Sequence, residues 1–298
     1  MRLVTYESDK RWHAGVIVDN QVVDATTTAI EAGLKFQDDW ISNRQILRLD
    51  PDQQSHFERA AFEIADSPPS KLDVFPLEDA ALGPPIPDPD KIICLGLNYR
   101  RHAEEAGLPI PEVPSLFAKY RNSLTGPASP IILPGVSEQV DYEAELAVVI
   151  GRRCKNITST QALAYVAGYM ALNDVSARDV QMRTGQWLAG KAIDSFAPCG
   201  PALVIDEIGD PQSLDISTRV NGQTLQQANT SDMIFSVAET ISFLSQLMTL
   251  EPGDIIATGT PEGVGFKRNP PIFLHAGDVV EVEVEDIGIL RNPVVRDG

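Results

Sequence analysis

One run of the sequence, residues 141–151, restricts the fold more than any other. Glu143 and Glu145 stand two residues apart and lead directly into the apolar stretch 146–150. Alternate side chains of an extended chain share a face, so both carboxylates lie on one side of a strand that continues into a core. A solvated edge strand is the simpler explanation of a lone Glu-x-Glu pair. Because Asp174 adds a third acid in an apolar setting, we predict a divalent-cation site.

The composition limits the class of protein. A chain of 298 residues with 43% hydrophobic residues can form one large or two ordinary domains, and its net charge of −18 argues against nucleic acid or anionic membranes as partners. No apolar run approaches the roughly 18 residues of a membrane helix, and the first residues are strand-like without a leader pattern, so we expect a cytoplasmic protein. Three widely spaced cysteines indicate neither disulfides nor a zinc site.

A proline-rich connector divides the chain. Residues 83–90 contain four prolines, which excludes a helix interior or a central strand and favours a stiff extended segment. We therefore predict a small N-terminal accessory domain of α+β type over 1–83, the connector over 84–90 and a larger domain over 91–298. The N-terminal part has a hairpin signal, Asp19-Asn20 between apolar runs, and a helical stretch over 44–64.

The larger part reads as β-rich α+β with peripheral helices. Short β-branched runs dominate, and Asn221-Gly222 and the alternating run 279–284 are strand and hairpin signals. Helices are expected after the capping boxes that begin at Thr158 and Ser236. Because strand-helix-strand alternation is not sustained and no Gly-x-Gly-x-x-Gly opens a helix, a Rossmann-type nucleotide domain is not expected.

Three other segments carry groups suited to catalysis. His102 and Glu105 are three apart on a predicted short helix and can share one face, although a solvated surface pair would have the same spacing. Lys191 follows a glycine and could stabilise negative charge near a metal, or be a surface lysine. Residues 257–265 read as a strand that ends in a Gly-rich loop, which could bind a carboxylate or be a simple turn.

Taken in order, these segments resemble the fumarylacetoacetate hydrolase family over nearly all of the chain after the connector. The matching pieces are Gly96-Leu97-Asn98-Tyr99 with His102 and Glu105, Phe117-Ala118-Lys119, 141–146, Asn173-Asp174, Ala177-Arg178-Asp179, Gly190-Lys191 and 258–261. They are most similar to two-domain members that act on 2-oxo acids. The resemblance implies a mixed β-roll catalytic domain and a homodimer.

The resemblance also implies roles for nine residues. It makes Glu143, Glu145 and Asp174 the ligands of Mg²⁺ or Mn²⁺, and it makes His102 with Glu105 an acid–base dyad on a lid. Lys191 is expected near the metal. The residues implied in substrate binding are Arg178, Gln181 and Thr260. Three carboxylates suit a hard cation that leaves positions open for a chelating 2-oxo acid, a small-molecule substrate.

Several reactions fit such a site. The first hypothesis is a metal-dependent hydrolase that cleaves the C–C bond of acylpyruvate-type (2,4-dioxo acid) substrates through a metal-bound pyruvate enolate. A 2-oxo-acid decarboxylase acting on oxaloacetate and an isomerase of unsaturated oxo-diacids use the same enolate chemistry. A protein of another class, which binds metal without catalysis, would not need His102, Glu105 and Lys191 intact.

Overall fold

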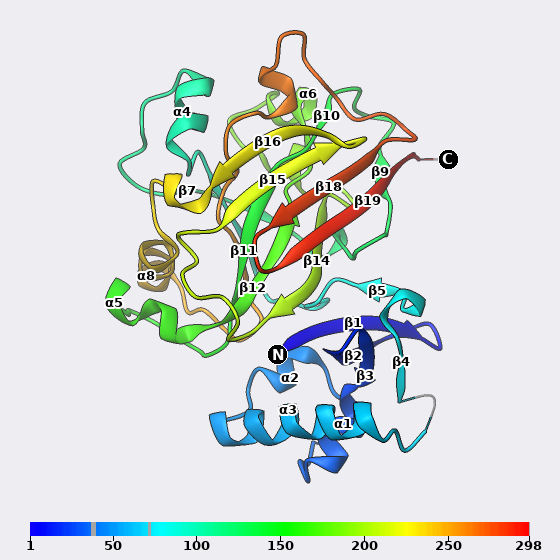
Figure 1. Ribbon diagram of the computed structural model, residues 1–298. Helices are drawn as coiled ribbons and strands as arrows, with labels where there is room; N and C mark the ends of the chain where they lie inside the picture. The colour runs from blue at the N-terminus through cyan, green and yellow to red at the C-terminus, as the bar shows by residue number, and fades with distance from the viewer. Residues whose placement is uncertain (37–39, 71–72, 298) are drawn as a thin grey trace.

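The computed structural model describes residues 1–36, 40–70 and 73–297. Its largest element is a mixed twelve-stranded sheet (Figure 1). The main path of this sheet runs, in spatial order, through β4 (Val74–Pro76), β3 (Gln21–Asp24), β2 (Arg11–Val18), β1 (Arg2–Ser8), β14 (Ala197–Val204), β12 (Val166–Asn173), β11 (Ala144–Ile150), β17 (Ile255–Ala257), β6 (Ile92–Gly96) and β7 (Ser115–Lys119). Two short strands join it at the side, β5 (Leu82–Gly83) on β1 and β8 (Leu124–Thr125) on β14.

A second sheet covers one face of the first. Its five strands are, in spatial order, β16 (Gln223–Asn229), β15 (Asp215–Val220), β18 (Val279–Val284), β19 (Gly288–Arg296) and β9 (Ile131–Leu133). The short strands β10 (Val140–Asp141) and β13 (Ser176–Ala177) pair separately. Valines of β18 alternate as predicted, and Val282 and Val284 pack in one core with Leu146 and Val148 of β11.

The helices lie around the sheets. They are α1 (Ala25–Glu31), α2 (Asn43–Ile46), α3 (Pro51–Asp66), α4 (Arg100–Ala106), α5 (Ser159–Ala162), α6 (Arg178–Gln181), α7 (Leu188–Lys191) and α8 (Val237–Leu247). Short 3₁₀ segments are η1 (Leu77–Asp79), η2 (Arg121–Ser123), η3 (Leu163–Tyr165), η4 (Thr230–Asp232) and η5 (Gly265–Lys267). Both predicted capping boxes are present, at Thr158 before α5 and at Ser236 before α8. The α+β class is confirmed.

Strand β11 is buried on both faces and separates two hydrophobic cores. Ala147 and Val149 belong to the core that extends toward the N-terminal part, whereas Leu146 and Val148 belong to the core below the five-stranded sheet. Each of these side chains is 0% exposed. Glu145 has the same parity as Ala147 and therefore shares its face, which fixes the direction of the carboxylate at the start of the strand.

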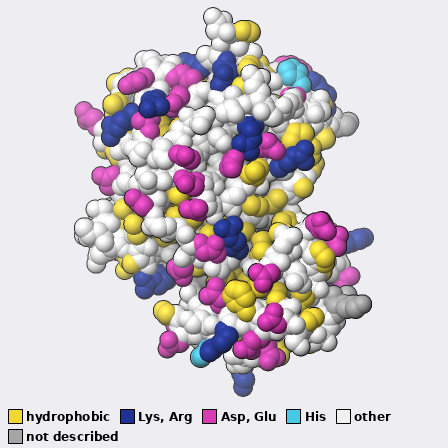
Figure 2. Space-filling view, in the orientation of Figure 1, with side chains coloured by type: hydrophobic (Ala, Val, Ile, Leu, Met, Phe, Trp, Pro, Cys, Tyr) yellow, Lys and Arg dark blue, Asp and Glu magenta, His cyan; other side chains and the backbone are white. Residues whose placement is uncertain are grey.

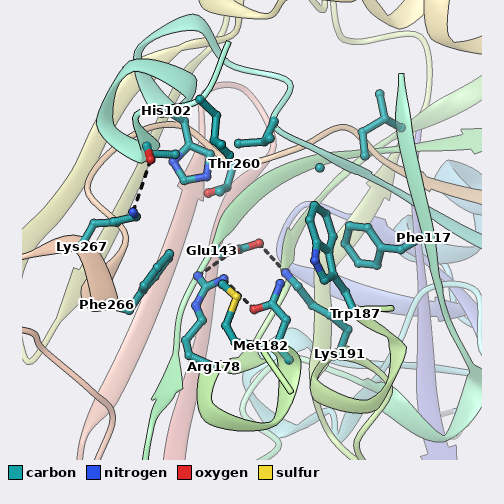
Figure 3. Close-up of a pocket in the computed structure, with 16 residues that line it drawn as sticks. His102, Phe117, Glu143, Arg178, Met182, Trp187, Lys191, Thr260, Phe266 and Lys267 are labelled. Atoms are coloured by element: carbon teal, nitrogen blue, oxygen red, sulfur yellow. Dashed lines mark hydrogen bonds and ion pairs between the residues drawn. The ribbon is translucent and has the colours of Figure 1, made fainter. Parts of the chain in front are cut away.

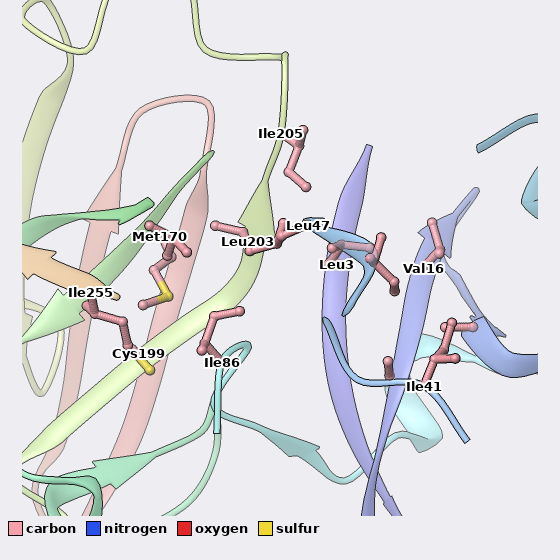
Figure 4. Close-up of a cluster of buried hydrophobic side chains, with 14 of the residues drawn as sticks. Leu3, Val16, Ile41, Leu47, Ile86, Met170, Cys199, Leu203, Ile205 and Ile255 are labelled. Atoms are coloured by element: carbon pink, nitrogen blue, oxygen red, sulfur yellow. The ribbon is translucent and has the colours of Figure 1, made fainter. Parts of the chain in front are cut away.

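The N-terminal part is packed onto the rest of the molecule. Strand β1 pairs antiparallel with β14, with Leu3 opposite Leu203, and so continues the large sheet. Figure 4 shows Leu3 and Val16 on one side of the same cluster that contains Leu203 and Met170 on the other. Residues 84–91 form neither helix nor strand. The division into domains at 83 and 91 stays a prediction, but the two parts share a core.

Local predictions in the N-terminal part agree with the structure except at one point. The hairpin is formed by β2 and β3, with Val18 opposite Gln21. The helical stretch predicted over 44–64 is divided into α2 and α3, because Asp50 caps a new helix that has Pro51 in its first turn. None of the helices in the described ranges has both the length and the apolar character that crossing a membrane requires. On the face shown in Figure 2, acidic side chains are spread over both the N-terminal part and the larger part.

Candidate active site

Three buried carboxylates meet at the ends of two neighbouring strands. Glu145 belongs to β11, Glu143 stands just before it, and Asp174 directly follows β12. The strands pair with Ala144 opposite Asn173, and the Asp174 N–H donates to the Glu143 carbonyl at 2.9 Å. Carboxylate oxygens of the three acids lie within 4.8 Å of one another, and each acid is at most 6% exposed. The structure therefore brings together the three acids predicted as metal ligands.

Two buried lysines neutralise these acids. The Lys191 ammonium lies 2.7 Å from Oε2 of Glu143 and 2.8 Å from Oδ2 of Asp174. On the other side of Asp174, the Lys119 ammonium lies 2.8 Å from Oδ1. Burial lowers the pKa of Lys119, and the Asp174 carboxylate offsets part of this effect. The Lys119 ammonium also donates to three backbone carbonyls, those of Val175, Lys191 and Phe196.

Arg178 contacts both the acids and Phe266, which lies in the loop after β17. Its Nη2 donates to Oε1 of Glu143 at 2.6 Å and lies 3.0 Å from Oδ2 of Asp141. Its Nη1 donates to Oε1 of Gln181 at 3.1 Å, because α6 places the two residues three positions apart. The guanidinium also stacks on the Phe266 ring, 4.3 Å from its centre. These contacts fix the orientation of the guanidinium.

Burial and neighbouring charges separate the two glutamates. Burial raises the pKa of Glu145 well above its ordinary value, and the nearby Asp174 and Glu143 raise it further. Burial also acts to raise the pKa of Glu143, but Lys191 and Arg178 outweigh it and lower that pKa to about 2. Glu143 is therefore ionised at neutral pH, and a positive charge near Glu145 would favour the loss of its proton.

The environment of Glu145 fits a cation. Its Oε2 accepts a hydrogen bond from the Gly259 N–H at 2.8 Å, so the predicted Gly-rich loop does bind a carboxylate, that of the protein itself. Its Oε1 is buried and has no hydrogen-bond partner among the described residues. A buried unpaired oxygen costs free energy, which a metal ion would remove. Because all three ligands are carboxylates, the group could hold a hard divalent ion such as Mg²⁺ or Mn²⁺.

His102 and Glu105 form the predicted pair on α4. The Nδ1 atom of His102 lies 3.1 Å from Oε2 of Glu105, and Oε1 of Glu105 accepts from the Gly263 N–H at 3.0 Å. Glu105 therefore orients the imidazole and is itself held by the loop after β17. The helix ends at Gly107, whose φ of +69° is a left-handed C-cap. His102 is only 8% exposed, so a solvated surface pair is excluded.

Most of the predicted site residues line one pocket of about 280 Å³ (Figure 3). Six of the nine predicted residues line it, namely His102, Glu143, Arg178, Gln181, Lys191 and Thr260. The remaining three contact these residues from behind, since Glu105 bonds His102, Asp174 bonds Lys191 and Glu145 lies beside Glu143. In Figure 3, His102 and Thr260 lie on one side of Glu143, and Arg178 and Lys191 lie on the other. This volume suits a small metabolite.

Three buried polar residues, for which the sequence predicts no role, hold parts of the site in place. Lys119 and Asp141 lie in segments that match the family, and the sequence predicts no role for them or for Gln226. Asp141 accepts from the backbone N–H groups of Gly265 and Phe266 at 2.8 and 3.0 Å. Gln226 donates to Oγ1 of Thr260 at 2.9 Å and to the Pro261 carbonyl, and it accepts from the Ala144 N–H between the two glutamates. The Asp-x-Glu-x-Glu spacing could have indicated Asp141, which is also fully buried.

Aromatic side chains also line the pocket. Phe117 and Trp187 meet edge to face with ring centres 5.6 Å apart, and the Lys191 ammonium lies 5.0 Å from the centre of the Phe117 ring. Trp187 lies so close to Gly96 that a β-carbon there would stand 2.3 Å from the indole. The glycine that ends β6 therefore leaves the space that the indole occupies.

The chain belongs to the fumarylacetoacetate hydrolase family and is an enzyme of that family. The family model "Fumarylacetoacetate (FAA) hydrolase C-terminal" matches residues 91–295. This match confirms the resemblance drawn from the ordered segments, and it covers both sheets except for the strands of the N-terminal part.

Named relatives carry out several reactions. The chain is 49% identical to "Oxaloacetate tautomerase Fahd2a, mitochondrial" of Rattus norvegicus over 76% of this chain and 73% of that protein. Among solved structures, it is similar to 5-carboxymethyl-2-hydroxymuconate delta-isomerase of Mycobacterium smegmatis, with a TM-score of 0.76 and 35% identity over all of both chains. Maleylpyruvate hydrolase of Sphingobium gives 0.78 and 31%, again over both full chains. The family fold is thereby confirmed, and the reaction is left open among these chemistries.

Proposed function

We propose that this protein is a divalent-metal-dependent enzyme that interconverts the enol and keto forms of oxaloacetate. One observation carries the proposal, namely that the His102–Glu105 pair faces the same small pocket as Glu143 and Lys191. An acid–base group and an electrophilic centre in one pocket are what proton transfer next to a carbonyl requires. The 49% identity to an oxaloacetate tautomerase supports this reaction over the others. Tautomerisation is not among the reactions predicted from the sequence.

The residues have distinct proposed tasks. Arg178, Gln181 and Thr260 would bind and orient the 2-oxo acid, and Glu143, Glu145 and Asp174 would hold Mg²⁺ or Mn²⁺. When bound, the ion would supply Lewis-acid polarisation of the 2-oxo group. The Lys191 ammonium, which faces the pocket beside Glu143, would stabilise negative charge on the substrate oxygen.

The proton would be moved by His102. In the enol-to-keto direction the C2 hydroxyl loses a proton, the C2=C3 double bond becomes single, and C3 gains a proton. With Nδ1–H donating to Glu105, whose Oε2 lies 3.1 Å away, Nε2 would be the basic nitrogen, and the carboxylate would stabilise the imidazolium during the transfer. No water is consumed in this reaction.

The acylpyruvate hydrolysis predicted from the sequence is the second candidate. It is supported by the likeness to maleylpyruvate hydrolase over the whole of both chains. In that reaction His102 would activate a water for attack on the C4 carbonyl, the C3–C4 bond would break, and C3 would be protonated. Decarboxylation of oxaloacetate and isomerisation of unsaturated oxo-diacids remain alternatives with the same residues. The homodimer and the cytoplasmic location also stay predictions, and the name of the rat relative places that protein in mitochondria.

The test is to add freshly dissolved enol-oxaloacetate to the Mn²⁺-loaded protein and follow the loss of enol absorbance. We expect faster conversion than in buffer with Mn²⁺ alone, and a loss of about 10²- to 10⁴-fold for His102→Gln. His275→Gln is the matched control, because His275 also has an acid three residues on, Asp278, but its side chain is 78% exposed. A parent protein that cleaves acetylpyruvate but leaves enol-oxaloacetate at the buffer rate would reverse the order of the two candidates.

A further inference from the structure

The charges that line the pocket are paired with one exception. Arg178 contacts Glu143 and Asp141, Lys191 contacts Glu143 and Asp174, and His102 contacts Glu105. Lys267 also lines the pocket and is exposed, so it lies where the pocket opens to solvent. Within the described ranges, its ammonium has no carboxylate partner.

The contacts of Lys267 are weak ones that a ligand could replace. Its Nζ lies 3.5 Å from the Ala106 carbonyl at the end of α4, which is long for a hydrogen bond, and 5.2 Å from the centre of the Phe266 ring (Figure 3). The backbone beneath it is firmly placed, because the buried Asp141 accepts from the N–H groups of Gly265 and Phe266. Hydrogen bonds therefore hold the backbone next to Lys267 in place, whereas the contacts of its ammonium are long.

The two ends of the pocket differ in charge. The deep end has Glu143 with Lys191, where the 2-oxo-acid group would bind, and the open end has Lys267 beside Phe266. The lining also includes apolar side chains, among them Leu95, Leu97 and Phe266. A second carboxylate of the substrate would lose hydration next to these side chains. This loss costs free energy, which contact with a cation would offset. On a chain of net charge −18, an unpaired lysine at the entrance would also favour the approach of an anion.

We propose that Lys267 binds the distal carboxylate of a 2-oxo diacid and makes the pocket selective for diacids over monoacids. The inference rests on the proposed function for the position of the 2-oxo-acid group. It adds the side chain that would recognise the second carboxylate, and so would distinguish a diacid from an acylpyruvate with a neutral tail. Lys267 is a specificity-determining residue in this assignment, and proton transfer does not require it.

The experiment compares two stable ligands with the same head group, lactate and malate, which differ by the distal carboxylate. Their dissociation constants are measured by calorimetry on the Mn²⁺-loaded protein. For Lys267→Met we expect malate to bind about 10- to 100-fold more weakly, the usual effect of losing a charged hydrogen bond, and lactate to change less than about 2-fold. Lys267→Arg should retain most of the preference for malate.

Lys155→Met is the matched control, because Lys155 is another exposed lysine that donates to a backbone carbonyl, that of Gln246 at 3.1 Å, and it does not line the pocket. Equal weakening of both ligands by Lys267→Met, or unchanged malate binding, would overturn the assignment. The binding result does not depend on turnover. A parent protein that prefers malate through Lys267 but leaves enol-oxaloacetate at the buffer rate would refute the tautomerase proposal and keep this one.

Discussion

Two clusters of ion pairs in this protein use the same residue types in opposite surroundings. The buried charge cluster lies beneath the pocket and consists of Lys119, Asp141, Glu143, Asp174, Arg178 and Lys191. The surface charge cluster lies on the solvent side of the five-stranded sheet and consists of Arg219, Glu281, Glu283 and Arg291. Side chains of the buried cluster are at most 8% exposed, whereas those of the surface cluster are 23–65% exposed.

The difference shows that position decides what a charge contributes. Arg219 stands directly opposite Glu281 on the neighbouring strand, and such exposed cross-strand pairs contribute about 0–1 kcal/mol. In the buried cluster both the acids and the cations lose their hydration, so the ion pairs add little net stability. Removing one partner nevertheless destabilises the protein, because the other charge is left buried and unpaired. Burying charged side chains beside a pocket costs desolvation free energy, so their presence there is best explained by a function that needs the charges.

The largest effect is expected for Glu143→Gln, which removes one charge from the centre of the buried cluster and keeps the side-chain volume. Turnover should fall to the rate of metal in buffer. Mn²⁺ affinity should fall by more than the roughly 10- to 100-fold typical of losing a group that only supports a ligand. Paramagnetic-resonance titration of Mn²⁺ and the enol assay measure the two effects.

Glu138→Gln is the control, because Glu138 is also paired with an arginine, Arg296, but its side chain is 75% exposed. It should change neither quantity. If Glu143→Gln bound Mn²⁺ as tightly as the parent, the carboxylate would not be a ligand, and the buried cluster would need another explanation.

A smaller loss, in stability, is expected for Lys119→Met. Methionine fills a similar volume, but Asp174 loses one cation and three backbone carbonyls lose their donor. Breaking a buried pair in this way typically costs about 3–5 kcal/mol in the free energy of unfolding, measured by urea denaturation without metal. Lys91→Met is the comparison, since Lys91 lies 2.7 Å from the buried Asp254 but is itself 29% exposed. The backbone N–H groups of residue 91 and of Glu251 would still donate to that carboxylate, so we expect less than half the loss. Equal losses for the two variants would contradict the role given to burial.

The sequence allowed prediction of those parts of the site that depend on local spacing. The alternation of Glu143 and Glu145 before an apolar run placed both acids on one face of a buried strand; in the structure Glu145 lies in β11, Glu143 stands just before it, and their carboxylates lie close together. The spacing of His102 and Glu105 likewise placed them on one face of a short helix. The break at Asp50 was also readable, because an Asp-Pro pair followed by Gln53 is a helix start.

Two of the supporting residues, Gln226 and Lys119, could not be predicted because their partners are distant in sequence. Gln226 bonds Ala144 and Thr260, which lie 82 and 34 residues away. Lys119 reaches Phe196 across 77 residues. No periodicity encodes which segments meet, and the pairing of β1 with β14 is equally invisible to local patterns. From the sequence alone, a lysine or glutamine is expected at the surface, because these residue types are mostly exposed.

The smallest effect is expected in the surface charge cluster, for Arg219→Ala. The alternation predicted for residues 279–284 puts Glu281 and Glu283 on the solvent side of β18, and the Arg219 guanidinium lies 3.1 Å from the first and 2.7 Å from the second. Because water and salt screen both contacts, the free energy of unfolding should fall by about 1 kcal/mol or less, and by less still at high salt. Urea denaturation at low and high salt measures this, with enol turnover unchanged. A salt-independent loss as large as that of Lys119→Met would mean that the number of ion pairs, rather than their burial, sets the cost of breaking them.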